Sequence, residues 1–348
     1  MNLFAIRMTP FHHPFCAAQQ GVSLVEIMVA LVAGLILIGG VGQVYLSNKQ
    51  TYRVQEAHSR LQENGRYTLE LLERDVRRAG YQGCGSRGSV TPNVIAKPPV
   101  VIFNAGTAVT GSEATGATWS PALSASLSNV VAGTDTITIQ FAAGCGGHLM
   151  GNMAADNANI QISAANTCQL AANDVFMISD CVSADIARAT SVSNGATIQT
   201  IAHANDVNMD NRLSKAYRSD SEILRVNSFT YYIRNGQGGQ PSLWQLDNTQ
   251  AVGGDNPAEL VEGVENMQVT YGEDTDNDGT PNQYLAANAI GDWANVRSVR
   301  INFLFRTLDN NLTTAAQSYS FNGTATTAGD RRLRRTFTAT IGVRNRLQ

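Results

Sequence analysis

The chain has 348 residues, a formal net charge of −3 and only 15% charged residues, against about 25% in a typical soluble domain. A balance so near neutrality does not by itself decide whether the chain binds nucleic acid. We predict no nucleic acid partner. The low share of charge, with many Thr, Asn, Ser, Ala and Gly residues, favours an extracytoplasmic, β-rich surface. The length allows a helical stem of about 60 residues and one large globular domain or two small ones.

The segment from Gln20 to Leu46 is apolar enough to enter a membrane. Between Val22 and Asn48 its one charged residue is Glu26, and a helix of about 20 residues crosses the hydrocarbon core of a bilayer. A carboxylate at the bilayer centre costs on the order of 2.5–3.5 kcal/mol, and less near the headgroups. We therefore expect Glu26 to lie near the headgroups or to meet a partner.

Gly21, Val22 and Glu26 together resemble the processing site of type IV prepilins. In that family a dedicated peptidase cuts after the glycine and methylates the new N-terminal amine. The resemblance implies that residues 1–21 are a leader, that cleavage falls between Gly21 and Val22, and that Val22 is N-methylated. It also implies that Glu26 pairs with the terminal amine of a neighbouring subunit during assembly, because a paired buried charge costs less than a lone one.

Two other interpretations of this N-terminus remain open. The first is a single-pass membrane anchor in which Glu26 is incidental. The second is a secretory signal peptide, which fits poorly because Arg7 is the only Lys or Arg before the apolar run and no A-x-A-like site follows that run.

Residues from Val22 to about Ala79 contain no proline and predict one long helix that ends at Gly80. An apolar half, residues 22–48, precedes an amphipathic half, residues 49–80. Apolar residues recur at helical spacing in the second half, at Val54, Leu61, Leu69, Leu72, Val76 and Ala79. A helix of this length would reach about 87 Å, further than any bilayer, so its second half should pack on a soluble domain.

The polar half carries a more specific resemblance. SLVEIMVAL, followed by LSNKQTYRVQEAHSRLQENGRYTLELLERDVRRAGYQGCG, is similar to the start of minor pilins of the PilW type. The resemblance implies a low-abundance subunit that helps to start or cap a type IV pilus. Its partners would be the prepilin peptidase, other minor pilins, the major pilin and a tip adhesin. It would sit in the inner membrane with its head in the periplasm, and then in the pilus at the cell surface.

Residues 81–348 predict a β-rich head domain. Apolar or alternating runs bounded by turn residues predict strands at 135–141, 174–180, 196–203, 222–234, 241–246, 296–307 and 336–344. Together with the N-terminal helix they predict an α+β fold, in which a long pilin helix packs on a largely antiparallel β-sheet domain.

The cysteines predict disulfides. Cys16 falls in the leader, and the remaining four, an even number in an exported chain, indicate two bridges with three possible connectivities. We favour Cys84–Cys145 and Cys168–Cys181, because the second pair brackets a single strand-like run. A tetrahedral zinc site is the alternative, which the absence of any C-x₂₋₄-C spacing disfavours.

The acidic stretch 273–280, EDTDNDGT, is the best candidate ligand site outside the helix. Its alternating aspartates followed by Gly279 copy the first half of an EF-hand loop, where oxygen ligands converge on Ca²⁺. The candidate Ca²⁺ ligands are Asp274, Asp276, Asp278, Thr280 (through its carbonyl) and Asn282, with Glu273 or Asp292 to complete the shell. The loop is not an EF-hand, because its twelfth position is Leu285 instead of Glu. The alternative is a solvated acidic turn between strands.

The C-terminal region is rich in arginine, at Arg331, Arg332, Arg334, Arg335, Arg344 and Arg346. These residues could form a basic patch for DNA or anionic lipid. We expect a solvated strand face instead, because acidic residues dominate the chain and no aromatic residues interleave with the arginines.

No catalytic set stands out, since the chain has no G-x-S-x-G, H-E-x-x-H or phosphate-loop motif. We predict a non-enzymatic minor pilin similar to the PilW type, which assembles by helix packing. One alternative is a J-type pseudopilin of type II secretion, because residues 259–272 resemble a stretch that both families share. The other is a membrane-tethered module that binds Ca²⁺ or another ligand and does not polymerise.

Overall fold

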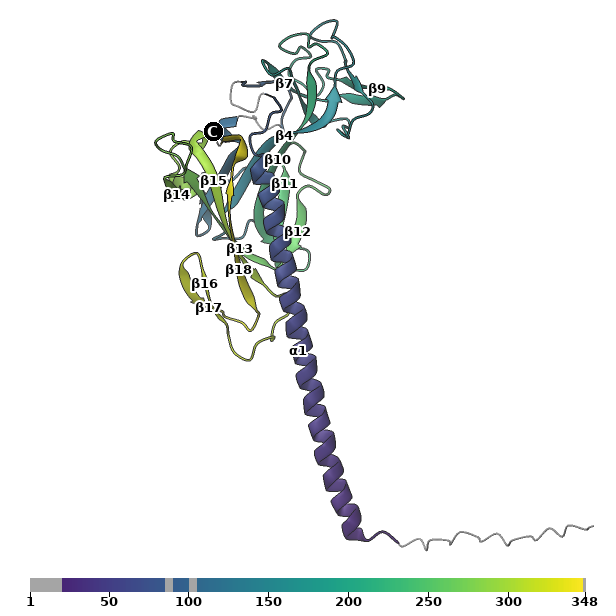
Figure 1. Cartoon of the computed structure of the whole chain (residues 1–348), viewed down its shortest axis with the longest axis vertical. Helices are drawn as coiled ribbons and strands as arrows, with labels where there is room; N and C mark the ends of the chain where they lie inside the picture. Colours follow the sequence, from purple (N-terminus) through teal and green to yellow (C-terminus); the bar gives the residue numbers. More distant parts are fainter. Residues whose placement is uncertain (1–20, 85–89, 100–104, 347–348) are drawn as a thin grey trace, which may run out of the picture. The chain divides into compact units, whose positions relative to one another are not determined.

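A computed structural model describes residues 21–84, 90–99 and 105–346. The predicted leader, apart from Gly21, lies outside the described residues, as does Cys16. The chain divides into two units, Met1–Val54 and Gln55–Gln348, which we describe separately. One α-helix, α1 (Leu24–Arg78), contributes residues to both units (Figure 1). The helix predicted from Val22 to about Ala79 is thus confirmed to within two residues at either end.

The second unit contains four sheets among its described residues. The large sheet is built from β1 (Asn93–Val94), β2 (Val109–Thr115), β3 (Thr118–Ser120), β4 (Thr136–His148), β6 (Val175–Ser179), β7 (Ala184–Arg188), β10 (Glu222–Asn235), β11 (Pro241–Asp247) and β12 (Ala258–Glu262). The C-terminal sheet is built from β13 (Val264–Glu273), β14 (Gln283–Leu285), β15 (Val296–Arg306) and β18 (Arg334–Gly342). The two smaller sheets pair β5 (Ile160–Ser163), β8 (Ser191–Asn194) and β9 (Ile198–Ala202), and β16 (Ser318–Phe321) with β17 (Thr324–Thr327).

Four short 3₁₀ helices lie in the connections, η1 (Ala105–Thr107), η2 (Ala287–Ala289), η3 (Trp293–Asn295) and η4 (Arg344–Arg346). All strand pairs named here are antiparallel except β1 with β7. The predicted α+β class, with a largely antiparallel sheet, is confirmed. The runs predicted at 135–141, 222–234 and 336–344 correspond to β4, β10 and β18.

Strand β10 organises the large sheet. One of its edges pairs with β4 from Glu222 opposite His148 to Tyr231 opposite Ile137. Its other edge is shared, because the first residues pair with β6 and the last seven pair with β11. Tyr231 and Tyr232 of β10 are fully buried on opposite faces, as the two-residue repeat of a strand requires.

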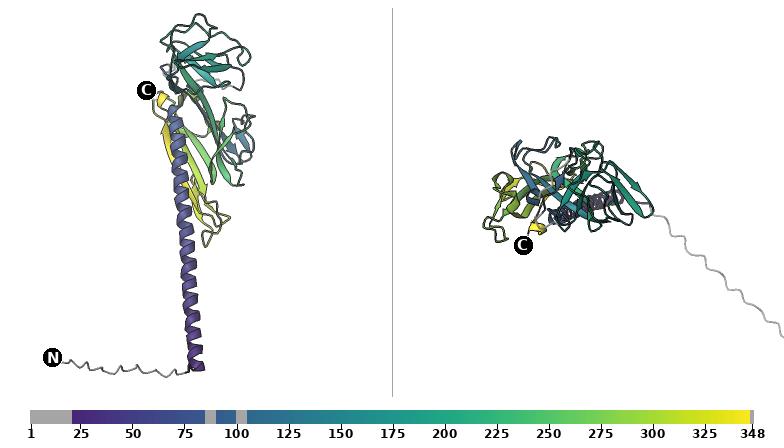
Figure 2. Two further views of the ribbon diagram at one scale, coloured as in Figure 1. Left: turned by 90° about the vertical axis from the view of Figure 1, so that its right-hand side faces the viewer. Right: turned by 90° about the horizontal axis from the view of Figure 1, so that it is seen from above.

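The polar half of α1 packs on this unit along one stripe. Its buried residues are Leu61, Gly65, Thr68, Leu72, Asp75 and Val76. Strand β18 approaches the helix at Gly65, where a Cβ would lie only 2.4 Å from the Phe337 ring. The yellow C-terminal strands run beside this part of α1 in Figure 2. Gly65 therefore lets an aromatic ring rest directly on the helix backbone.

The C-terminus of α1 is closed by residues from the far end of the chain. Gly80 adopts φ 75°, the left-handed conformation that commonly follows a helix. The Asn345 side chain donates hydrogen bonds to the carbonyls of Arg78 (3.3 Å) and Ala79 (3.0 Å), which have no partner within the helix. Arg346, next in sequence, is buried and donates to the carbonyls of Trp293 and Val296.

The disulfides are Cys84–Cys181 and Cys145–Cys168, so the predicted pairing of Cys84 with Cys145 and Cys168 with Cys181 is wrong. Strand β6 lies between Cys168 and Cys181 and separates its own ends by about 3.3 Å per residue. Bridged Cα atoms must lie within about 7 Å, and they lie 5.0 and 4.7 Å apart in the observed pairs. The cysteines therefore pair with residues that the fold brings close, which their spacing in the sequence does not show.

Candidate functional site

The first unit exposes a long, largely apolar helical surface. Among its described residues, those from 21 to 50 are exposed, with Gly34 alone partly covered. Val25, Leu35 and Leu46, for example, are 68, 67 and 65% exposed. By length and composition α1 can cross a membrane. An apolar surface this large needs lipid or other helices to cover it.

Glu26 lies in the first turn of α1, where its backbone is capped by Ser23. The Glu26 N–H donates to the Ser23 hydroxyl oxygen at 3.2 Å and to the Ser23 carbonyl at 3.0 Å. Ser23 and Glu26 thus have the S-x-x-E spacing of a capping box, a signal that our sequence analysis missed. A carboxylate in the first turn is also favoured by the positive end of the helix dipole.

The predicted cleavage point lies just before this turn. Gly21 and Val22 precede α1 in non-helical, exposed backbone, and a Cβ at Gly21 would meet nothing within 4 Å. The three N-terminal site residues, Gly21, Val22 and Glu26, therefore lie together around the start of the helix.

The acidic loop between β13 and β14 brings together the aspartates predicted from the sequence. One carboxylate oxygen from each of Asp274, Asp276 and Asp278 lies within 4.8 Å of the others. The Asp274 oxygens accept hydrogen bonds from the N–H groups of Asp278 (3.2 Å) and Gly279 (3.0 Å), which curl the chain around this side chain. Asp274 is buried, whereas Asp276 and Asp278 are exposed.

Hydrogen bonds of Asn282 and Thr280 hold the two ends of the loop together. The Asn282 side chain accepts from the Thr275 N–H at 2.7 Å and donates to Asp276 at 3.1 Å. The Thr280 N–H and hydroxyl both donate to Asp278. Glu273 and Asp292, the predicted additional ligands, face other groups. Glu273 accepts from the Asp292 N–H and from Gln283, and Asp292 accepts from the Ala294 N–H.

Arg297 holds the buried member of this cluster, and no sequence pattern pointed to this contact. Its Nε lies 3.0 Å from Asp274 Oδ2. Burial acts to raise the pKa of Asp274, but the Arg297 guanidinium and the Gly279 N–H outweigh it and hold that pKa below its ordinary value. Asp274 is therefore ionised at neutral pH, with Oδ2 held from outside the loop.

A second acidic pair is formed by Glu113 of β2 and Asp135. No sequence pattern pointed to this pair. Asp135 is buried and accepts from the N–H groups of Ala114 (2.9 Å) and Val269 (2.8 Å), which ties β2 to β13. Burial, and then the neighbouring charge of Asp135, raise the pKa of Glu113 to about 7. Burial is the main reason that the pKa of the Tyr271 hydroxyl is raised, and the negative charges of both carboxylates raise it further.

The C-terminal arginines do not form one face. Arg331, Arg335 and Arg344 are exposed, as expected for a solvated surface. Arg334 and Arg346 are buried, so that expectation is wrong for these two. Arg334 pairs with Glu265 and Asp330 at 2.7 and 2.6 Å, whereas Arg346 bonds to backbone carbonyls. Successive side chains of a strand point to opposite faces. Arg334 therefore faces inward to its ion pairs, whereas the adjacent Arg335 is exposed.

Comparison with known proteins identifies both ends of the chain. A model of the prokaryotic N-terminal methylation motif matches residues 16–42, which include Gly21, Val22 and Glu26. A model of type IV pilus-assembly protein W matches residues 230–345, from the middle of β10 into η4. No curated protein matches the chain.

Among solved structures, the chain is similar to a type IV-like pilin from Thermus thermophilus, with 16% sequence identity. The similarity covers 36% of this chain and 70% of that one, and its TM-score of 0.20 is too low to support an argument. The functional assignment therefore rests on the two sequence models. Together they indicate a minor pilin of type IV pilus assembly that is similar to the PilW type and carries a prepilin methylation motif.

Proposed function

We propose that this subunit primes or caps a type IV pilus. Before assembly it lies in the inner membrane with its head in the periplasm. It then reaches the cell surface as part of the filament. The observation that carries the proposal is the exposed apolar half of α1, whose one carboxylate lies in its first turn. Such a surface can pass from lipid to a bundle of like helices without changing its own structure.

The steps at the N-terminus follow from the chemistry of these residues. Prepilin peptidase cuts between Gly21 and Val22, which leaves a cationic amine four residues before Glu26, and then methylates it. In the growing filament Glu26 accepts the terminal amine of a neighbouring subunit, which fixes the register of the two helices. The head is then free to contact other minor pilins, the major pilin or a tip adhesin. We assign it no catalytic activity.

The mass and first residue of the membrane-extracted protein test the processing step. We expect a chain that begins at N-methylated Val22. A chain that keeps residues 1–21 in cells with active prepilin peptidase would contradict the proposal and favour a tethered module. Glu26→Ala should keep the head folded but abolish incorporation into pili, with Glu56→Ala, on the exposed side of the polar half, as the control. Normal incorporation of the Glu26 variant would count against assembly through this carboxylate.

We also propose that the acidic loop binds Ca²⁺. The ligands would be the side chains of Asp274, Asp276 and Asp278, the Thr280 carbonyl and the Asn282 side chain. Support comes from the convergence of the three carboxylates within 4.8 Å. A further argument is the fixed orientation of Asp274, because Arg297 and Gly279 hold Oδ2 and leave Oδ1 on the side of the Asp278 N–H. A cation would relieve the repulsion among these acidic groups.

Thermal unfolding of the full chain in detergent, with and without Ca²⁺, tests this site. At 100 times its Kd, a bound ion would add about 2.7 kcal/mol to the free energy of unfolding, and we expect Tm to rise by several degrees. Mg²⁺ should act more weakly, because it accepts this irregular oxygen shell less readily. Asp276→Asn with Asp278→Asn should abolish the rise, whereas Asp220→Asn with Asp255→Asn should leave it. An unchanged Tm in the native chain would refute the site.

A further inference from the structure

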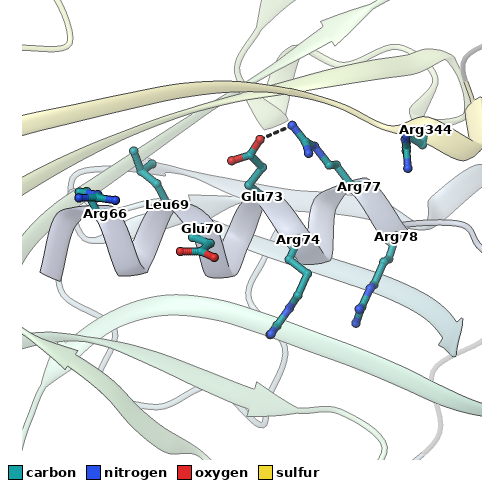
Figure 3. A pocket seen from close by; sticks show the side chains of 8 residues that line it. All are labelled: Arg66, Leu69, Glu70, Glu73, Arg74, Arg77, Arg78 and Arg344. Carbon is teal, nitrogen blue, oxygen red and sulfur yellow. Dashed lines mark hydrogen bonds and ion pairs between the residues drawn. The ribbon is translucent and has the colours of Figure 1, made fainter. Parts of the chain in front are cut away.

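A groove of about 680 Å³ lies along the last turns of α1, and Figure 3 shows the side chains that line it. None of these helix residues belongs to the buried stripe. Five arginines line it, Arg66, Arg74, Arg77, Arg78 and Arg344. Glu70 and Glu73 are the acidic lining residues, so the local balance is five positive charges against two negative ones. This groove is cationic although the whole chain carries a net charge of −3.

Internal ion pairs satisfy only part of this positive charge. Arg77 pairs with Glu73, as the dashed line in Figure 3 shows, and Arg74 bonds to Asp75 at 3.3 Å. Asp75 is itself buried and accepts from the Tyr231 hydroxyl at 2.6 Å. Within the described part of the chain, Arg66, Arg78 and Arg344 pair with no carboxylate.

Helix stability explains only some of these arginines. Cations in the last turn are favoured by the helix dipole, which accounts for Arg77 and Arg78. Arg66 lies three turns earlier. Arg344 is exposed and comes from η4, whose next two residues, Asn345 and Arg346, are anchored to backbone carbonyls. The fold therefore brings a fifth arginine to a helix face that already carries four.

We propose that this groove binds an acidic segment of a neighbouring pilin subunit. Guanidinium groups bind carboxylates through two parallel hydrogen bonds, and three of them are available here. The two glutamates would repel a continuous phosphate backbone, and the lining contains no aromatic residue on which a base could stack. A protein surface of mixed charge can match both signs. This contact adds a head-to-head interface to the helix packing proposed above.

Site-specific photo-cross-linking in pilus-forming cells tests the groove in the full chain. A benzoylphenylalanine in place of the exposed Glu70 should form an adduct with another pilin subunit, at a segment rich in Asp and Glu. The triple variant R66Q/R78Q/R344Q should reduce that adduct about tenfold or more. The matched control R218Q/R331Q/R335Q removes the same charge from exposed positions outside the groove and should leave the yield unchanged.

Four outcomes would overturn the proposal. They are no adduct, an adduct at a neutral or basic segment, an adduct with lipid or nucleic acid, and an equal loss of yield in the control triple. The adduct should also form in the Glu26→Ala background, because the heads of membrane-held subunits can meet before assembly. Failure of the groove can therefore be told from failure of the assembly carboxylate.

Discussion

The two halves of α1 are built from one continuous helix but depend on different surroundings. In the first unit, Leu35 is 67% exposed and its helix face has no protein partner among the described residues. In the second unit, Leu72 is fully buried in the core with β-sheet residues such as Phe303 and Phe305. A helix needs tertiary contacts to be stable in water. The polar half obtains them within its own chain, whereas the apolar half must find them in lipid or in other subunits.

The largest predicted effect separates the two halves by the same substitution. Leu72→Ala should lower the free energy of unfolding of the head by about 2–5 kcal/mol, because it leaves a cavity in the core. Leu35→Ala should change it by less than about 0.5 kcal/mol. Chemical denaturation of the full chain in detergent, followed by tryptophan fluorescence, measures both. Equal losses would mean that the apolar half belongs to the folded head.

Glycine gives the next contrast. Gly65→Ala should cost about 1–3 kcal/mol, because its methyl group would meet the Phe337 ring. Gly40→Ala has open space around its Cβ and should favour the helix by about 0.5–1 kcal/mol. Phe337→Leu should recover part of the loss when combined with Gly65→Ala. If Gly65→Ala were neutral by the same denaturation assay, the close approach of β18 would be wrong.

A change of pH should act on the head without involving the apolar half. The pKa of Glu113 is about 7 in the folded protein against an ordinary value of 4.5, so the folded state keeps this proton longer than the unfolded state. Stability should therefore be highest below about pH 4.5 with respect to this group, and should fall as the pH rises to about 7. Glu113→Gln should flatten that fall in denaturation midpoints taken between pH 4.5 and 8, and Glu262→Gln should not. A rise in stability across this range would contradict the raised pKa of Glu113.

The smallest predicted effect lies at the first turn of α1. Ser23→Ala removes the side chain that caps the Glu26 N–H and should destabilise the local helix by about 0.5–2 kcal/mol. Amide exchange of the processed protein in detergent should become faster near Leu24–Ile27 and stay unchanged near Leu72. Unchanged exchange at the first turn would show that this turn is ordered by other contacts.

Local patterns were predictable from the sequence, and long-range pairings were not. The helix, its stripe at Leu61, Leu72 and Val76, and the convergence of Asp274, Asp276 and Asp278 all follow from residues close together in the chain. The stripe also contains Gly65 and Asp75, which a search for apolar periodicity passes over. Gly65 contacts Phe337 and Asp75 contacts Tyr231. Both partners lie more than 150 residues further along the chain.

The acidic loop and the disulfides show the same division. Arg297, which holds Asp274, comes from another strand, 23 residues away in sequence. The cysteine pairing failed because it depends on where β6 runs, which spacing alone does not reveal. The carboxyl pair of Glu113 and Asp135 depends on the contact of β2 with β4 and β13.

The cap that Asn345 places on α1 also determines when the end of the helix can be completed during synthesis. Asn345 and Arg78 are 267 residues apart, and the Phe337 ring that covers Gly65 is made nearly as late. At about 5–20 residues per second, a ribosome needs roughly 13–50 s to supply these partners after the helix has emerged. During that interval the apolar half can already enter the bilayer, while the buried stripe of the polar half waits uncovered. The buried stripe of the polar half can therefore be fully covered only after Phe337 and Asn345 have been made.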